Sequence, residues 1–281
     1  MSNRFGFMAL VGLTAALAIA GTPAQAGDTL NKIKKAGKVT VGTEAAFPPF
    51  EFVEHGKIVG YGSDILKHVV AGLGVELNQL DVPWPGILPG VLAGKFDFIA
   101  TTVVMRPDRA KKFAFTMPIA EGGSSILKRK GDGRINSAAD LDGKVVGVQL
   151  GTTGEKLMRE LDKSLKAQGK AGLKELKIFT ANPASYLSLA NGQTDAAVSL
   201  LPSLAVLLKK RAGLYEIVGP VNDKKTWLAW VTRPDDTELR DYINTKIKEL
   251  RDNGKLYEMQ KKWFGFSMEI PSSGYIPAGG I

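Results

Sequence analysis

Residues 93–100 have the sequence AGKFDFIA, and residues 191–198 have the sequence NGQTDAAV. In both stretches a glycine marks the end of a helix, and after two further residues an aspartate opens a short apolar strand. The pairs Val41-Gly42 and Val146-Gly147, each placed before a loop, extend the likeness towards the start of each half. This weak internal repeat predicts two lobes of similar α/β build.

Short apolar runs alternate with helical patterns on either side of these stretches. The expected strands are 39–41, 75–80, 96–100, 144–148 and 176–179, and the expected helices are 65–73, 87–92, 154–161, 186–190, 237–253 and 256–264. Strand–helix–strand alternation is typical of a mostly parallel sheet with helices on both faces. The predicted fold class is therefore α/β.

Two chain crossings, near 118–123 and 222–227, are expected to join the lobes. Lobe 1 is then discontinuous and comprises 27–122 and 224–281. Lobe 2 is the inserted segment 123–223. We therefore expect the second crossing to return the chain to the lobe in which it began.

The two ends of the chain differ in composition from the lobes. Residues 1–26 have the pattern of a secretory signal: Arg4 precedes an uncharged, largely apolar run over 5–20, and Ala24-Gln25-Ala26 offers a cleavage site. A membrane anchor is the alternative, but the run is shorter than the ~20 residues that a span needs. Cleavage after Ala26 and a periplasmic location are predicted. The segment after Gly265, rich in Pro, Gly and Ser, predicts a loop or a disordered tail.

Composition excludes several classes of function. The chain has no cysteine and only two histidines, His55 and His68, which excludes thiolate zinc sites, iron–sulfur clusters and cysteine nucleophiles. No metal or cofactor is expected. The net charge of +9 comes from small basic groups such as Lys128-Arg129-Lys130, without interleaved aromatic residues. Solvated surface charge is therefore expected rather than nucleic-acid binding.

Five short motifs carry a family likeness. They are VGTEAAFPPFEF at 41–52, Gly60-Tyr61 with Asp64-Ile65, RPDRA at 106–110, VGVQLGTT at 146–153, and KWFG at 262–265. In order and spacing, over roughly residues 38–265, they resemble the family 3 extracellular solute-binding proteins, the polar amino-acid receptors of ABC importers.

The resemblance implies a fold and a mode of action. The fold is the type II periplasmic binding protein fold, in which two lobes, each a mostly parallel sheet flanked by helices, are joined by two hinge crossings. The lobes would close on an amino acid or a related small carboxylate, and a membrane ABC permease would recognise the closed form. The chain is expected to act as a monomer.

Arg109 is the first candidate for ligand binding. A planar guanidinium holds a carboxylate through two parallel hydrogen bonds, which lysine cannot reproduce. Arg109 follows Pro107-Asp108 at an expected helix start, where the resemblance places the family's carboxylate-binding arginine. The alternative is a surface arginine paired with Asp108 or Asp64.

The loop Gly151-Thr152-Thr153-Gly154 is the second candidate. It lies between an expected strand and an expected helix, where free N–H groups and the positive helix end favour an anion. Thr152 and Thr153 add hydroxyl donors. Alternatively, one of them only caps the helix, and both roles are compatible. The resemblance implies that this loop meets the carboxylate held by Arg109, so that the ligand bridges the lobes.

Aromatic side chains are candidates for the walls of the ligand site. Phe47 and Trp84 correspond to the family's aromatic or apolar walls, and both lie in proline-containing loops. Core packing is the alternative for both. Tyr61 is a further candidate.

Three polar residues complete the expected site. Glu44 stands where many relatives carry an aspartate that contacts the distal group of the ligand; solvent exposure is the alternative. Thr101 and Thr102 lie at the carboxyl end of an expected strand, where open α/β sheets bind their ligands.

Two positions depart from the family pattern. Val104 replaces the usual Ser or Thr, and Leu200 replaces the aspartate that balances the ligand's α-ammonium. Enclosing an unpaired ammonium against leucine would cost several kcal/mol. The ligand is therefore expected to lack an α-ammonium, or to direct a cation towards Glu44 and the aromatic faces, while a carboxylate binds Arg109.

Two other functions stay open. Relatives of this fold include periplasmic dehydratases of cyclic carboxylates, for which Glu44 is the available cleft acid. The sequence has no nucleophile elbow, phosphate loop or histidine-based metal pair, so binding without catalysis is expected. A ligand-sensing receptor module is the other alternative.

Overall fold

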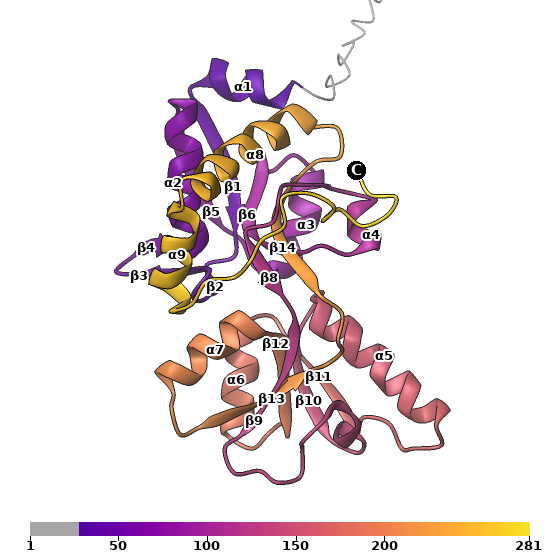
Figure 1. The fold of residues 1–281 in the computed structure, drawn as a ribbon. Helices are drawn as coiled ribbons and strands as arrows, with labels where there is room; N and C mark the ends of the chain where they lie inside the picture. The colour runs from indigo at the N-terminus through magenta and orange to yellow at the C-terminus, as the bar shows by residue number, and fades with distance from the viewer. Residues whose placement is uncertain (1–27) are drawn as a thin grey trace, which may run out of the picture.

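The first lobe is built on a sheet that combines strands from distant parts of the chain (Figure 1). The computed structural model describes residues 28–281. The strand order is β5 (Glu76–Asp81), β1 (Lys38–Thr43), β6 (Phe98–Val104), β14 (Thr226–Thr232) and β7 (Ala114–Phe115), and β8 (Ala120–Gly122) pairs with β14. β1 runs parallel to β5 and β6, whereas β14 runs antiparallel to β6.

The second lobe repeats this plan. Its strand order is β11 (Glu175–Phe179), β10 (Val145–Gln149), β12 (Ala196–Leu200), β9 (Ser124–Arg129) and β13 (Tyr215–Pro220). β10 is parallel to β11 and β12, and β9 is antiparallel to β12 and β13. The trio β11-β10-β12 therefore corresponds to the trio β5-β1-β6.

The repeated aspartate has the same task in both lobes. The carboxylate of Asp97 accepts a bond from the Thr40 backbone N–H at 2.8 Å, while the Asp97 N–H donates to the Thr40 carbonyl at 2.7 Å. Asp195 forms the matching pair with Val145, at 3.0 and 2.7 Å. Asp97 thus fixes the start of β6 against the central strand β1, and Asp195 fixes the start of β12 against the central strand β10, which explains the repeat seen in the sequence.

Helices cover both sheets. Lobe 1 contains α1 (Thr29–Ala36), α2 (Tyr61–Leu73), α3 (Trp84–Leu92), α4 (Pro107–Ala110), α8 (Thr237–Asp252) and α9 (Lys255–Phe264), with a small sheet of β2 (Ala46–Phe47), β3 (Glu51–Glu54) and β4 (Lys57–Val59). Lobe 2 contains the 3₁₀ helix η1 (Ala138–Leu141), α5 (Thr153–Ala167), α6 (Asn182–Ala190) and α7 (Leu201–Lys210). The two-lobed α/β fold is as predicted.

The strands beside the crossings make the sheets mixed rather than mostly parallel. The chain leaves lobe 1 after β8 and enters lobe 2 with β9; it leaves after β13 and returns as β14. The outgoing and returning segments run in opposite directions, so β14 pairs antiparallel with β8, and β13 with β9. Two antiparallel strand pairs therefore flank the passage between the lobes (Figure 1).

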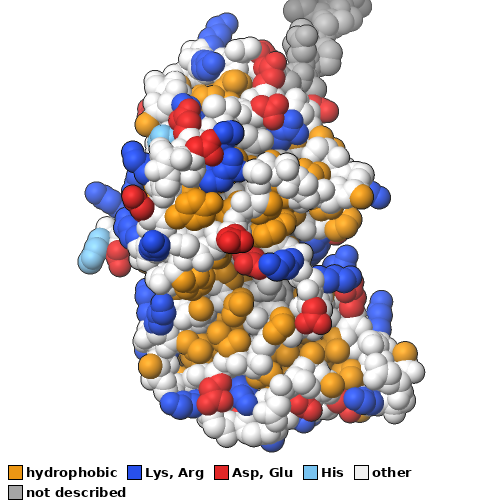
Figure 2. Space-filling model, viewed as in Figure 1, with side chains coloured by type: hydrophobic (Ala, Val, Ile, Leu, Met, Phe, Trp, Pro, Cys, Tyr) orange, Lys and Arg blue, Asp and Glu red, His pale blue; other side chains and the backbone are white. Residues whose placement is uncertain are grey.

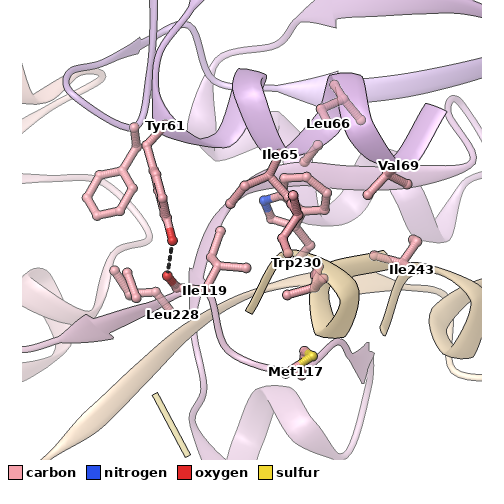
Figure 3. Packing of buried hydrophobic residues seen from close by; sticks show 14 of the residues in the cluster. Tyr61, Ile65, Leu66, Val69, Met117, Ile119, Leu228, Trp230 and Ile243 are labelled. Carbon is pink, nitrogen blue, oxygen red and sulfur yellow. Dashed lines mark hydrogen bonds between the residues drawn. The ribbon is translucent and has the colours of Figure 1, made fainter. Parts of the chain in front are cut away.

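The core of lobe 1 lies on both faces of its sheet. One cluster includes Ile65, Leu66 and Val69 of α2, which pack with Trp230 of β14 and Ile243 of α8 (Figure 3). The opposite face carries a second cluster, to which α3 contributes. These contacts join segments that lie far apart in the sequence into one rigid half.

The tail after α9 forms neither helix nor strand, as predicted, but it packs against lobe 1 (Figure 1). Met268 and Ile270 are buried, and Tyr275 contacts both core clusters. The Ile281 N–H donates to the carbonyl of Ala110 in α4 at 2.9 Å. The tail therefore reaches the helix that carries Arg109.

The surface carries dispersed charge. Figure 2 shows lysine and arginine side chains over both lobes, with aspartate and glutamate among them. Within residues 28–281, none of the helices is both long enough and apolar enough to cross a bilayer. The predicted signal segment lies outside the described residues.

Candidate functional site: a cavity between the lobes

The candidate site is a cavity lined by both lobes. It encloses about 440 Å³ of space, part of which is open to solvent. Lobe 1 contributes Glu44, Phe47, Trp84, Thr102, Val104 and Arg109; lobe 2 contributes Ser124, Gln149, Thr152, Thr153, Gly154, Asn182, Val198, Ser199 and Leu200. Several of these residues stand at or just after the carboxyl ends of β1, β6, β10 and β12, where open α/β sheets bind ligands.

Arg109 is a buried cation in the wall of this cavity. Its side chain is held by two carbonyl oxygens: Nη1 donates to Val104 at 3.3 Å and Nη2 donates to Gly151, across the lobe boundary, at 3.0 Å. The guanidinium carbon lies 5.3 Å from the centre of the Trp84 ring. Among residues 28–281, no carboxylate lies within 4.0 Å of it. Burial, with a contribution from nearby Arg106, lowers the pKa of Arg109 to about 9.

The expected alternative, an ion pair between Arg109 and a neighbouring aspartate, is not what the structure shows. It is Arg106 that pairs with Asp108, through two bonds of 3.0 and 2.8 Å. Asp64 instead accepts bonds from Lys262 and Trp263. Within the described chain, neither Asp108 nor Asp64 therefore forms an ion pair with Arg109.

The loop before α5 faces Arg109 from lobe 2. Thr152 is the N-cap: its Oγ1 accepts from the Glu155 N–H at 3.2 Å and donates to the Gln149 carbonyl at 2.7 Å. The hydroxyl of Thr153 accepts from Arg106 at 3.3 Å. Since the first N–H groups of a helix have no partner inside the helix, those of Thr153 and Gly154 remain as donors beside the cavity. The capping role and an anion-binding role are thus compatible here.

Glu44 provides the opposite charge. Its Oε1 accepts a 2.5 Å bond from Gln149 Nε2, which joins lobe 1 to lobe 2. Gln149 is itself fixed by Asn182, whose Nδ2 donates to Gln149 Oε1 at 2.7 Å. Glu44 is only 5% exposed, and burial raises its pKa to about 7, although the Gln149 bond opposes the shift. The predicted alternative of solvent exposure does not hold for this residue.

Apolar side chains complete the cavity walls. The Phe47 ring stacks on Phe50 at 5.4 Å between centres, so its orientation is fixed by the core of lobe 1. Trp84 begins α3 and is 6% exposed. Val104 and Leu200, the two departures from the family pattern, also line the cavity. Both aromatic residues therefore combine core packing with a position at the cavity.

Two expected site residues lie outside the cavity. Tyr61 is fully buried in the core of lobe 1, and its hydroxyl donates to the Ile119 carbonyl at 2.5 Å (Figure 3). Thr101 donates to Glu51 Oε2 at 2.8 Å. The carboxyl group of Glu51 is buried, which raises its pKa, and a donor at this place compensates for the lost water. The structure thus places Tyr61 and Thr101 in the core of lobe 1, outside the cavity lining.

Gly154 lines the cavity as part of the predicted loop 151–154, whereas five other lining residues were not predicted from sequence. Gln149, Val198 and Ser199 lie within or next to segments singled out as candidates, so their nearness in sequence was an available signal. For Ser124 and Asn182, the sequence offered no such signal. Asn182 reaches the cavity because the preceding strand, β11, lies beside β10 in the sheet.

The two lobes and the polar cavity between them define a class, the bilobed binding proteins that enclose a small solute. Residues 39–266 match the bacterial extracellular solute-binding proteins, family 3, and the chain belongs to this family.

Relatives support the same assignment. The L-cystine-binding protein TcyJ of Escherichia coli is 29% identical over 267 residues, which cover 93% of this chain and 97% of that protein. The glutamate/aspartate import solute-binding protein of Salmonella typhimurium is 31% identical, covering 92% of this chain and 86% of that protein.

Solved structures show the same fold. The P235GK mutant of ArgBP from T. maritima superposes with a TM-score of 0.74 at 33% identity, over 84% of this chain and 99% of the other. The ancestral amino acid-binding protein AncCDT-1, a precursor of cyclohexadienyl dehydratase, gives a TM-score of 0.73 at 30% identity, over 84% and 99%.

Proposed function

We propose that this chain is the solute-binding component of an ABC importer and that it captures a small organic carboxylate, an amino acid or a related acid, between its lobes. Family membership and relatives that bind amino acids support the transport role. The proposed ligand-binding residues are those cavity residues that the sequence also singled out: Glu44, Phe47, Trp84, Thr102, Val104, Arg109, Thr152, Thr153 and Leu200.

One observation carries the proposal of a carboxylate ligand. Within residues 28–281, Arg109 is buried at the cavity and no carboxylate oxygen lies within 4.0 Å of its guanidinium nitrogens. Its pKa falls to about 9 because burial penalises the charge. A bidentate carboxylate would restore that lost stabilisation. The N-terminal N–H groups of α5 approach the same region from the other lobe. A carboxylate held by both would link the lobes and favour closure.

The lobe division proposed from sequence accommodates this mechanism. With lobe 1 as 27–122 and 224–281 and lobe 2 as 123–223, the division falls at the β8–β9 and β13–β14 connections. Rotation about these two connections would open the cavity without breaking either sheet. A membrane permease would then distinguish the closed form from the open one.

Export and assembly are proposed as follows. Its extracellular character supports a periplasmic location. We propose removal of residues 1–26 after Ala26 and a monomeric receptor that meets its permease at the membrane surface.

Binding without turnover is the proposed activity. The solved neighbour described as a precursor of a dehydratase makes an acid-catalysed elimination the competing activity. Glu44, with a pKa of about 7, is the cavity group that could supply the proton. Recovery of the bound ligand unchanged after prolonged incubation would support binding; release of water and a dehydrated product would support catalysis.

Removal of the guanidinium tests the carboxylate site. A true ligand present at a hundredfold its Kd adds about 2.7 kcal/mol to the stability of the folded protein. We expect Arg109→Ala to abolish this gain in a thermal-shift screen of small carboxylates, and Arg109→Lys to retain only part of it because the bidentate geometry is lost.

The control for this screen is Arg134→Ala, which removes an exposed arginine of lobe 2 that pairs with Asp132. It should leave the ligand-induced gain unchanged. A gain that survives in Arg109→Ala would place the carboxylate elsewhere and defeat the proposal.

A further inference from the structure

Resting on this proposed function, we infer that the ligand is a zwitterion whose two charges are far apart: a carboxylate at Arg109 and a cationic nitrogen at Glu44, with no ammonium on the α-carbon. The inference specifies which carboxylates are bound. It uses three features of the cavity: the guanidinium of Arg109, the carboxyl group of Glu44, and the composition of the lobe-2 wall.

The lobe-2 wall has no group that balances an ammonium beside the carboxylate. Of the cavity residues, those from lobe 2 carry hydroxyls, amides, backbone or aliphatic groups, and none is acidic. Leu200, which lines this wall, offers only an aliphatic side chain. An α-ammonium is attached one carbon from the carboxylate, so it would lie in the positive region of Arg109 and the α5 N-terminus, with no anion to compensate its lost hydration.

Glu44, the acidic residue of the cavity lining, lies in the lobe-1 wall. Among residues 28–281, no lysine, arginine or histidine nitrogen lies within 4.0 Å of its carboxylate, and no ion pair joins it to Arg109. Gln149 donates only a neutral amide hydrogen to it. The Phe47 ring belongs to the same lobe-1 wall and offers an aromatic face to a cation. The cavity thus has a buried guanidinium and a buried carboxyl group that are not paired with each other within the described residues.

A ligand with matching separated charges satisfies both groups. Its carboxylate pairs with Arg109 and its cation with Glu44, so neither protein charge is buried alone. An α-amino acid with an apolar side chain satisfies Arg109 but leaves its ammonium without a partner. A simple fatty acid leaves Glu44 without one. Amines, amidines and guanidines at the far end of a short carboxylate form the favoured class.

Titration calorimetry with matched probes tests this class. We would compare 5-aminopentanoate and 4-guanidinobutanoate with 2-aminopentanoate and pentanoate. At least one of the first two should bind ten or more times more tightly than either of the last two. Glu44→Gln, which retains an acceptor for Gln149, should reduce their affinity to that of pentanoate.

Position 200 allows a test by gain of function. Leu200 is the N-cap of α7, with φ −70° and ψ 133°, and both aspartate and asparagine are favourable at such a position. Leu200→Asp should therefore fold and should bind 2-aminopentanoate at least tenfold more tightly than the wild type. Leu200→Asn is the matched control, which caps the helix without charge and should show no such gain.

The outcomes separate this inference from the proposed function. Tight binding of 2-aminopentanoate by the wild type, equal binding of pentanoate and the ω-cationic acids, or a folded Leu200→Asp variant with unchanged selectivity would each overturn the inference while leaving a carboxylate receptor intact. Absence of binding by all four probes would overturn the inference. Binding that is insensitive to Arg109→Ala would overturn the proposed function itself.

Discussion

Glu44 and Arg109 illustrate how one cavity changes the chemistry of its side chains. Burial makes the charged form of each less favourable, so the pKa of the acid rises to about 7 and that of the base falls to about 9. Neither shift is visible in the local sequence, because it arises from the walls that both lobes place around the two groups. These shifts also make the site sensitive to pH.

The pKa of Glu44 predicts how stability depends on pH. The folded state holds this proton more tightly than the unfolded chain, so the contribution of Glu44 is fully present below pH 4.5 and is lost as the pH rises through about 7. Glu44→Gln lacks this loss. Its stability relative to wild type should therefore rise between pH 4.5 and 7, by up to about 3 kcal/mol.

Urea unfolding of both proteins from pH 4.5 to 8 measures this difference. Glu51, whose pKa is raised mainly by burial and further by the charge of Glu44, is present in both proteins, so that only its coupling to Glu44 remains in the difference. A stability difference that stays constant over this range would show that Glu44 titrates as an ordinary exposed carboxyl group.

At the residue scale, the sequence allowed a large part of the cavity lining to be predicted. Arg109, Thr152 and Thr153 could be placed because their motifs combine a strand end with a helix start, which positions side chains locally. Tyr61 could not, since its direction depends on α9 and on Ile119, which are distant in sequence. Composition shows that a tyrosine is available but not which way it points.

At the element scale, the helices and strands with strong periodicity were the ones that could be predicted. The hairpin over β2–β4 has strands of two to four residues, too short to show a period. β9 ends with Lys128 and Arg129, and because charged residues are typical of exposed segments, the sequence does not indicate a buried strand here. Lys128 is nevertheless buried, because its Nζ donates to the Ile135 carbonyl at 2.9 Å.

The C-terminal tail is a second element whose role depends on contacts rather than on propensity. Residues 267–281 lie beyond the region that matches the family, yet they bury Met268 and Ile270 and bond to α4 through Ala110. Deletion of 267–281 should lower stability by roughly 3 kcal/mol or more, because each buried side chain contributes about 1.5–3 kcal/mol. It should also weaken carboxylate binding, since α4 carries Arg109.

Thermal unfolding and calorimetry of the truncated protein check this prediction. The double variant Met268→Ala/Ile270→Ala keeps the bond to Ala110, and should reproduce the loss of stability with a smaller loss of affinity. A truncated protein with the melting temperature and the affinity of the full chain would contradict a supporting role for the tail.

At the scale of the whole molecule, the lobes also meet outside the cavity. Ser203 of α7 donates to the Pro48 carbonyl at 2.6 Å, and Lys209 Nζ donates to the Phe264 carbonyl at 3.0 Å. Lys210 lies 5.3 Å from the centre of the Phe52 ring. These residues do not line the cavity, so we expect their contacts to stabilise a closed arrangement by the same amount for every ligand.

Lys209→Met should therefore weaken all ligands alike. Loss of one partly buried hydrogen bond predicts a roughly two- to tenfold rise in Kd. The ranking of ligands should stay unchanged, because a term common to all ligands cancels in a ratio of affinities. Calorimetry over the four probes measures both the rise and the ranking. Lys170→Met, on an exposed turn, is the control. A changed ranking would show that Lys209 senses the ligand itself.

The position of β14 has a consequence for how the chain folds during its synthesis. This strand lies between β6 and β7 and contributes the buried Trp230, yet it follows the whole of lobe 2 along the chain. During translation, the edge of β6 therefore stays unpaired until all of lobe 2 and then β14 have been synthesised. Such a delay is compatible with the export that we propose, in which the chain crosses the membrane before lobe 1 is complete.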